Sequence, residues 1–156
     1  MIPIVEDSCV IRKATSDDAQ VLCDLYVNHL SATPPKEPQD MAIWQKKLTR
    51  FESDPFYHLL VAESEGRVVS TVTLIIVENL THNLKPYAII ENVVTHVDYR
   101  GKNYATKLMN KASEIAAEFG CYKIMLMTSS KKDSTLGFYE KCGFDRQEKT
   151  AFIKRL

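Results

Sequence analysis

The sequence predicts a mixed α/β (α+β) domain with a central twisted sheet of about seven strands and about four helices. Three observations predict this fold class. The runs 67–77 and 87–96 are rich in β-branched and apolar residues, which is typical of strands. Residues 104–119 instead repeat their apolar positions with the period of a helix. Another apolar run follows at 122–128, and this strand–helix–strand order predicts a right-handed parallel crossover.

The length and composition indicate one folded unit. A chain of 156 residues falls within the ordinary range of one domain, and no Gly-, Ser- or Pro-rich linker divides it. We therefore expect a single domain over residues 1–156. Hydrophobic residues make up 45% and charged residues 26% of the chain, which excludes a disordered or fibrous protein.

The charge balance and the cysteines exclude several classes of function. Lys plus Arg equals Asp plus Glu at 20 each, which disfavours a nucleic-acid partner. No run is long and apolar enough to span a bilayer, and the first residues lack a leader pattern, so we expect a cytoplasmic protein without membrane contact. The four cysteines are scattered without a C-x-x-C pair, which favours neither a metal site nor a disulfide framework.

The first quarter of the chain predicts one strand and two helices. Residues 9–14 form the expected first strand. Residues 15–18 (TSDD) then offer capping oxygens and first-turn acids to a helix that reaches about His29. The prolines of segment 31–39 cannot continue that helix, so this segment is expected as a loop before a second helix at 40–52.

The middle of the chain predicts three strands. Residues 58–63 and 67–77 are expected to pair as a hairpin around the turn 64–66. A polar loop at 78–86 leads to the strand 87–96, which is apolar on both faces and therefore expected near the centre of the sheet.

The last third of the chain begins with its clearest helix, 104–119, which Gly120 ends. The strand 122–128 and a short helix at 134–141 follow. Two short strands, 145–148 and 151–155, are expected to complete the sheet.

A basic turn precedes the clearest helix. Arg100, Gly101 and Lys102 lie just before helical amides that have no intrahelical partner, and such amides attract phosphate groups. Gly101 would let the backbone approach an anion closely. The alternative is a solvated basic connector, and spacing alone does not decide between the two. Neither a Walker motif nor a G-x-G-x-x-G motif is present.

Two motifs carry a resemblance to a known family. The segment VDYRGKNYATKL resembles the acetyl-CoA-binding segment of the GNAT superfamily of N-acetyltransferases, with Arg100 at its first position and Ala105 at its last. Asn103 departs from the family's middle glycine. Downstream, GFYEKCGF (137–144) resembles the second signature of the family, although Lys132 stands where the family has an asparagine. The resemblance implies the GNAT fold, and the cofactor half is similar to glucosamine-6-phosphate N-acetyltransferases.

The resemblance also implies a reaction and a cofactor site. The reaction is direct attack of a small molecule's primary amine on the thioester of acetyl-CoA, the cosubstrate, without a metal. The backbone of Val93, Val94 and Thr95 would line the pantetheine arm and polarise the acetyl carbonyl. The pyrophosphate would lie against the turn and the start of the helix, a set made of Arg100, Gly101, Lys102, Asn103, Tyr104, Ala105 and Thr106.

Two residues are the candidates for proton transfer. Tyr139 in the second motif is the candidate general acid for the coenzyme A thiolate, the alternative being a half-buried aromatic residue of the core. Glu91 interrupts an apolar strand and is the candidate base, directly or through water. Its alternative is a solvent-facing or ion-paired carboxylate. Substrate-facing segments are expected at 31–39, at 79–87 and at the chain end.

The sequence also permits other hypotheses about function. A non-catalytic acyl-CoA sensor would use the same loop, although it would need neither Tyr139 nor Glu91. A protein or peptide N-acetyltransferase is a further variant. A homodimer is expected by analogy with the family. At Asn103, a positive φ would mean that asparagine replaces glycine by conformation.

Overall fold

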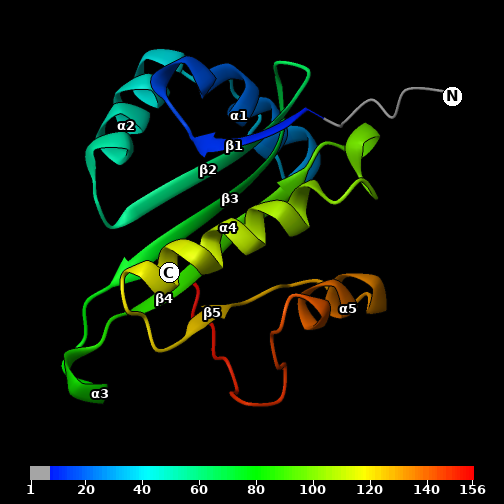
Figure 1. Ribbon diagram of the computed structural model, residues 1–156. Coiled ribbons are helices and arrows are strands. Elements are labelled where there is room, and N and C mark those ends of the chain that lie inside the picture. Colours follow the sequence, from blue (N-terminus) through cyan, green and yellow to red (C-terminus); the bar gives the residue numbers. More distant parts are fainter. Residues whose placement is uncertain (1–7) are drawn as a thin grey trace, which may run out of the picture.

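A computed structural model describes residues 8–156, so residues 1–7 of the expected domain lie outside the described part (Figure 1). Its centre is a mixed sheet in the order β1-β2-β3-β4-β5. Neighbouring strands are antiparallel, except that β4 and β5 run parallel. The strands are β1 (Cys9–Lys13), β2 (Tyr57–Ser64), β3 (Arg67–Val77), β4 (Tyr87–Thr95) and β5 (Ile124–Leu126).

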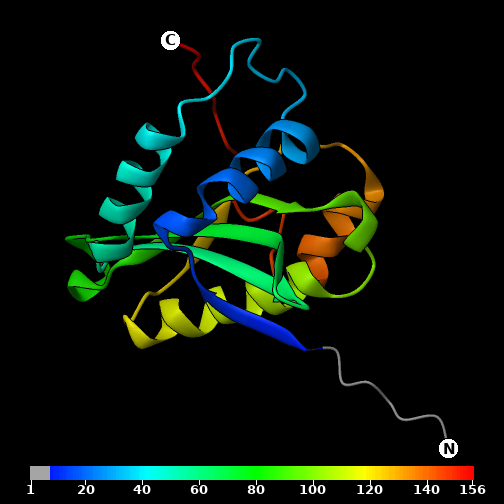
Figure 2. The same ribbon diagram turned by 90° about the horizontal axis from the view of Figure 1, so that it is seen from above.

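Helices cover both faces of this sheet (Figure 2). One face packs against α1 and α2, and the other packs against α4, so each face has its own apolar core. The helices are α1 (Ala19–Leu25), α2 (Met41–Ser53), the short α3 (Thr81–Leu84), α4 (Tyr104–Glu118) and α5 (Asp133–Lys141). Three further turns are the 3-10 turns η1 (Ser16–Asp18) and η3 (Val97–Tyr99) and the π-helical turn η2 (Tyr26–Leu30).

The structure confirms the predicted α/β class and the parallel pairing across the crossover. The predicted count of about seven strands is wrong, because the described sheet has five. Residues 145–148 and 151–155 form no strand and lie exposed, with Phe152 at 91% exposure. Residues 145–148 contain no apolar residue, and 151–155 contain only the run Ala151 to Ile153. A strand forms only against a partner edge, and no other described strand pairs with either segment.

Strand β4 changes its direction at one residue. Its register against β3 shifts between Thr71 and Thr73, where Asn92 is an extra residue with a φ of 53°. This is a β-bulge, which bends a strand and redirects its side chains. Pairing between β4 and β5 covers only Ala88 to Ile90, before the bulge. Beyond it, β4 leads to the turn before α4, while the chain after β5 leads to α5 (Figure 1).

A charged network connects β1, β2 and η1. The Arg12 guanidinium donates to both Asp18 oxygens at 2.7 and 2.8 Å and to Glu63 Oε1 at 2.7 Å. Burial alone would raise the pKa of Asp18, but hydrogen bonds from Arg12 and Thr15 and the charge of Arg12 outweigh it and hold that pKa below its ordinary value. Asp18 therefore stabilises the fold above its unfolded-state pKa, and this contribution is lost as the pH falls through the folded-state value.

We predict that Arg12→Met lowers the free energy of unfolding at neutral pH by about 1 to 2 kcal/mol, because it leaves the Asp18 carboxylate without its cation. Urea unfolding followed by circular dichroism at pH values from neutral to acidic measures this loss. The difference from the unsubstituted chain should shrink in acid, where Asp18 is protonated in both. Arg146→Met is the matched control, because the Arg146–Glu140 ion pair is exposed. Equal losses for the two variants would contradict the prediction.

Within the described residues, no helix has the length and apolar character needed to cross a membrane.

Candidate active site

The β4 edge beyond the bulge has no ladder partner on the side of β5 among the described residues. Val93, Val94 and Thr95, the predicted pantetheine residues, all lie on this segment. Val94 packs into the core beneath α1 and α2, and Val93 packs against the opposite core. Because the side chains of Val93 and Val94 pack into the two cores, the main-chain groups of this segment are the ones available to bind a ligand.

The turn before α4 has a left-handed backbone at two of its residues. Gly101 has a φ of +76° and Asn103 a φ of 66° with a ψ of 14°, in the left-handed region. Asparagine therefore replaces glycine here by conformation, which is the alternative that a positive φ decides. Asn103 is also the N-cap of α4, and its carbonyl accepts the Lys107 N–H at 3.0 Å. The following N–H groups, of Tyr104, Ala105 and Thr106, belong to the first helical turn and have no intrahelical acceptor.

The side chains of this turn differ in their roles. Arg100, predicted as a positive charge for a diphosphate, donates to the Thr95 carbonyl at 3.2 Å and to the His29 carbonyl at 3.5 Å. It thereby connects the turn to β4 and to η2. Lys102 is exposed, with its ammonium 5.4 Å from the Tyr99 ring. Tyr104 is a core residue at 3% exposure, and its hydroxyl donates to Ser64 Oγ at 2.9 Å.

Glu91 and Tyr139 approach the same region from β4 and α5. Glu91 is exposed and pairs across the sheet with Thr73, so both side chains lie on the face of α1 and α2. Tyr139 is half-buried between Phe138 and Phe144, at ring centroid distances of 5.1 and 6.4 Å. Burial raises the pKa of Tyr139, and the nearby Cys142 and Glu91 raise it further. The Tyr139 phenol is therefore protonated near neutral pH, and the negative charge of Glu91 contributes to this effect.

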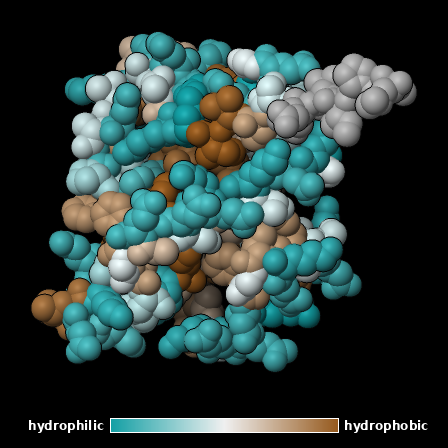
Figure 3. All heavy atoms as spheres, viewed as in Figure 1, coloured by the Kyte–Doolittle hydropathy of each residue, from teal (hydrophilic) through white to brown (hydrophobic). Residues whose placement is uncertain are grey.

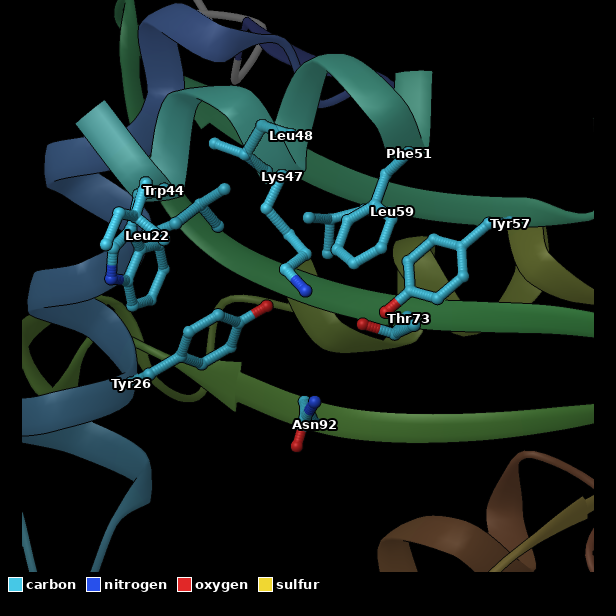
Figure 4. Close-up of a pocket in the computed structure, with 11 residues that line it drawn as sticks. Leu22, Tyr26, Trp44, Lys47, Leu48, Phe51, Tyr57, Leu59, Thr73 and Asn92 are labelled. Carbon is cyan, nitrogen blue, oxygen red and sulfur yellow. The ribbon is translucent and has the colours of Figure 1, made fainter. Parts of the chain in front are cut away.

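A pocket of about 280 Å³ lies between the sheet and the helices α1 and α2 (Figure 4). Tyr26 from η2, Lys47 from α2 and Tyr57 from β2 point into it, above Thr73 and Asn92 on its floor. The remaining lining residues are Leu22, Ile43, Trp44, Leu48, Phe51 and Leu59. The pocket thus joins apolar walls to a small polar centre beside Glu91.

The tyrosines of the pocket are poor acids. Burial raises the pKa of Tyr26, against the effect of hydrogen bonds to Thr71 and Thr73. Burial also raises the pKa of Tyr57, and the charge of Glu91 raises it further. Thr73 and the charge of Arg50 act in the opposite direction and lower it. Both phenols are therefore protonated near neutral pH. The charge of Glu91 contributes to the raised pKa of Tyr57 and of Tyr139.

The sequence did not indicate this pocket. The sequence pattern predicts Tyr26 as part of the apolar stripe of a helix and Trp44 as a core residue, so neither is indicated as a pocket residue. The pocket takes no lining residue from the predicted substrate segments 31–39 and 79–87 or from the described chain end. No local signal identifies its members, because they come from separate elements that meet only in the folded chain.

Segment 79–87 lies at the start of β4, away from Glu91. His82 stacks on Tyr122 at 3.9 Å, and Leu80 and Leu84 are exposed at 86% and 69%. Hydrophobic surface is visible at this corner, at the lower left (Figure 3). A second hollow of about 700 Å³ lies there, lined by Phe56, Ile76, Glu78, Asn79, Leu80, Leu84, Pro86 and Phe119. No set of three or more His, Cys, Asp or Glu residues in the part of the chain from residue 8 onward could hold a metal ion.

Comparisons with known proteins agree on one family. The profile of the Acetyltransferase (GNAT) family matches residues 20–144. The chain is 26% identical over 148 residues to glucosamine 6-phosphate N-acetyltransferase 1 of Dictyostelium discoideum, covering 94% of this chain and 91% of that protein. It is 30% identical over 125 residues to glucosamine 6-phosphate N-acetyltransferase of Trypanosoma brucei brucei, covering 79% and 80%. A solved structure from Agrobacterium tumefaciens str. C58, assigned as an acetyltransferase, has a TM-score of 0.84 at 37% identity, covering 94% and 99%.

Proposed function

The chain belongs to the acetyltransferase (GNAT) family and is an N-acetyltransferase, and we propose that it transfers the acetyl group of acetyl-CoA to a primary amine of a small molecule. The observation that carries this proposal is the exposed Glu91 carboxylate, which pairs across the sheet with the pocket residue Thr73 and directly precedes the segment of β4 that lacks a partner on the β5 side. A base beside an acceptor pocket and an acid for the departing thiolate are what direct amine attack on a thioester needs.

The turn and the β4 edge fit the cofactor. Two left-handed positions, Gly101 and Asn103, flank Lys102 just before the amides that begin α4, and this arrangement suits a pyrophosphate. Lys102 adds positive charge at the same turn. The unpaired β4 edge at Val93 to Thr95 suits the amide groups of a pantetheine arm, which would bind as an added strand. When bound, acetyl-CoA supplies the activated acetyl thioester.

Two residues of the chain carry out the proton transfers of the proposed reaction. Glu91, directly or through a water, accepts a proton from the amine, whose nitrogen forms the new bond to the acetyl carbon. A main-chain N–H of the β4 edge stabilises the negative charge that develops on the carbonyl oxygen. As the carbon–sulfur bond breaks, the Tyr139 hydroxyl donates its proton to the leaving sulfur. The products are the N-acetylated amine and coenzyme A thiol.

Amine-dependent release of coenzyme A thiol tests the function. The panel comprises amino-sugar phosphates, aminophosphonates, polyamines and amino acids, with glucosamine 6-phosphate included because the curated relatives bear its name. We expect release with at least one acceptor and none without an amine. Tight acetyl-CoA binding without release for any amine would instead identify an acyl-CoA sensor.

We predict that Glu91→Gln lowers kcat about 10-fold at neutral pH, because an exposed carboxylate shares its role as base with solvent. The deficit should narrow as the pH rises, since more of the amine is then already deprotonated. Steady-state pH profiles measure both effects. Glu78→Gln, at the far end of the sheet, is the control. A deficit that stays constant with pH would exclude the base role.

The exposed chain end supports the predicted homodimer. Phe152, Ile153 and Leu156 are exposed at 91%, 60% and 115%, and β5 is an edge strand of the described sheet. A second copy of the chain would give these residues an apolar and hydrogen-bonding partner. We expect light scattering of the full chain to give twice the monomer mass, and a monomer at micromolar concentration would contradict this.

A further inference from the structure

The pocket beside Glu91 has an uneven distribution of charge. Among the described residues that line it, Lys47 is the only cationic side chain, and no Asp or Glu is present. Lys47 projects from α2 toward the space between the Tyr26 and Tyr57 hydroxyl groups (Figure 4). Its ammonium takes part in none of the ion pairs formed within residues 8–156. Lys47 is exposed, so its ammonium is solvated rather than buried, and a ligand that brings a negative charge would complement it.

The other polar groups of the pocket are few. Besides the Trp44 indole they are the hydroxyls of Tyr26, Tyr57 and Thr73 and the Asn92 amide, and Thr73 acts against burial to lower the pKa of both tyrosines. The walls around them are aliphatic and aromatic, with Leu48, Phe51 and Trp44 among them. Few groups therefore remain for a ligand rich in hydroxyls, and the walls suit a compact ring or alkyl body.

The Glu91 carboxylate lies just outside the pocket lining. Lys47 enters the pocket from the helix side, whereas Glu91 is next to the floor residue Asn92 in sequence and opposite the floor residue Thr73 across the sheet. A molecule that fills the pocket and reaches past its floor would meet a positive charge at one end and a carboxylate at the other. An amine at the Glu91 end lies toward the β4 edge, where the proposed function places the thioester.

On these observations, and resting on the proposed function, we infer that Lys47 anchors an anionic group of the acceptor. The acceptor class is a primary amine that carries one carboxylate or phosphate on a compact, mainly apolar body. Polyamines are disfavoured as acceptors, because their second cation would lie against Lys47. Lys47 acts through binding, so its loss should raise the acceptor's KM and leave the KM of acetyl-CoA unchanged.

Three amines on one ring test the charge requirement with shape held nearly constant. They are para-(aminomethyl)benzoate, para-methylbenzylamine and para-xylylenediamine, which place an anion, a neutral group and a cation opposite the reacting amine. We expect kcat/KM for the benzoate to exceed that of the neutral amine about 10-fold, and the diamine to be the poorest. A second comparison measures kcat/KM for glucosamine 6-phosphate and for glucosamine. The comparison that gives the larger ratio of anionic to neutral kcat/KM identifies carboxylate or phosphate as the preferred anion.

Variants at the same helix complete the test. Lys47→Met should lower kcat/KM for the anionic amine about 10-fold and leave the neutral amine within about twofold, and Lys47→Arg should restore most of the preference. Lys46→Met is the matched control, because Lys46 is exposed on α2 and does not line the pocket. Equal rates across the charge series, or equal losses for anionic and neutral amines in Lys47→Met, would overturn the inference while leaving the acetyltransferase function intact. Calorimetry with coenzyme A present provides a readout independent of turnover. Absence of both turnover and anion-dependent amine binding would overturn the inference and the proposed function together.

Discussion

Tyr139→Phe is expected to lower kcat about 100-fold while changing the dissociation constant of acetyl-CoA less than about twofold. The substitution removes one hydroxyl and keeps the ring that packs between Phe138 and Phe144. Burial, together with Cys142 and Glu91, raises the pKa of this phenol, so the acid form persists through neutral and mildly alkaline pH. Without it, the departing thiolate must take its proton from water.

Steady-state kinetics and equilibrium binding of acetyl-CoA measure the two quantities separately. Tyr122→Phe serves as the control, because Tyr122 stacks on His82 at the opposite end of β4. Thermal unfolding of both variants shows whether the fold is retained. If kcat stays unchanged in a folded Tyr139→Phe protein, Tyr139 is a packing residue and the proton comes from elsewhere.

Asn103→Val is expected to weaken acetyl-CoA binding roughly 30-fold, since a β-branched residue at a left-handed position costs about 2 kcal/mol. Asn103 has a φ of 66° and caps α4, so the strain falls on the turn that presents the helix amides. The valine variant would relieve that strain by turning its backbone and withdrawing those amides. Isothermal titration calorimetry with acetyl-CoA and with coenzyme A measures the loss.

The matched variant is Asn103→Gly, which adopts the same φ without strain. It should bind acetyl-CoA no less tightly than the unsubstituted chain. Weaker binding by the glycine variant would mean that the asparagine side chain, rather than its backbone conformation, serves the cofactor. Equal binding by the valine variant would exclude any role of this backbone shape.

The features read correctly from the sequence are those set by neighbouring residues. The apolar stripe of α4 and the glycine that ends it depend on local periodicity and local backbone preference. The parallel crossover also follows from element order, because a strand, a helix and a strand leave few ways to reconnect. The family resemblance belongs to this class, since both motifs are contiguous.

The end of the chain shows where local patterns fail. Residues 151–155 begin with the apolar run Ala151 to Ile153 and are predicted as a strand, yet Phe152 and Ile153 remain exposed and unpaired in the described chain. Strand formation needs hydrogen bonds to another strand, and that partner is not encoded in the segment itself. Arg100 is a second case, because its donation to the Thr95 and His29 carbonyls depends on η2 reaching the turn.

By itself, the sequence determined the α/β class and the family, both of which rest on contiguous residues, whereas the structure decided the left-handed backbone at Asn103. Only the tertiary structure decided the pocket, where Tyr26, Lys47, Tyr57 and Thr73 converge from four separate elements. It also decided that Glu91 lies opposite Thr73, beside the pocket floor. The physical reason is that hydrogen bonding and charge complementarity across a site depend on distances in space, which the spacing of residues along the chain does not determine.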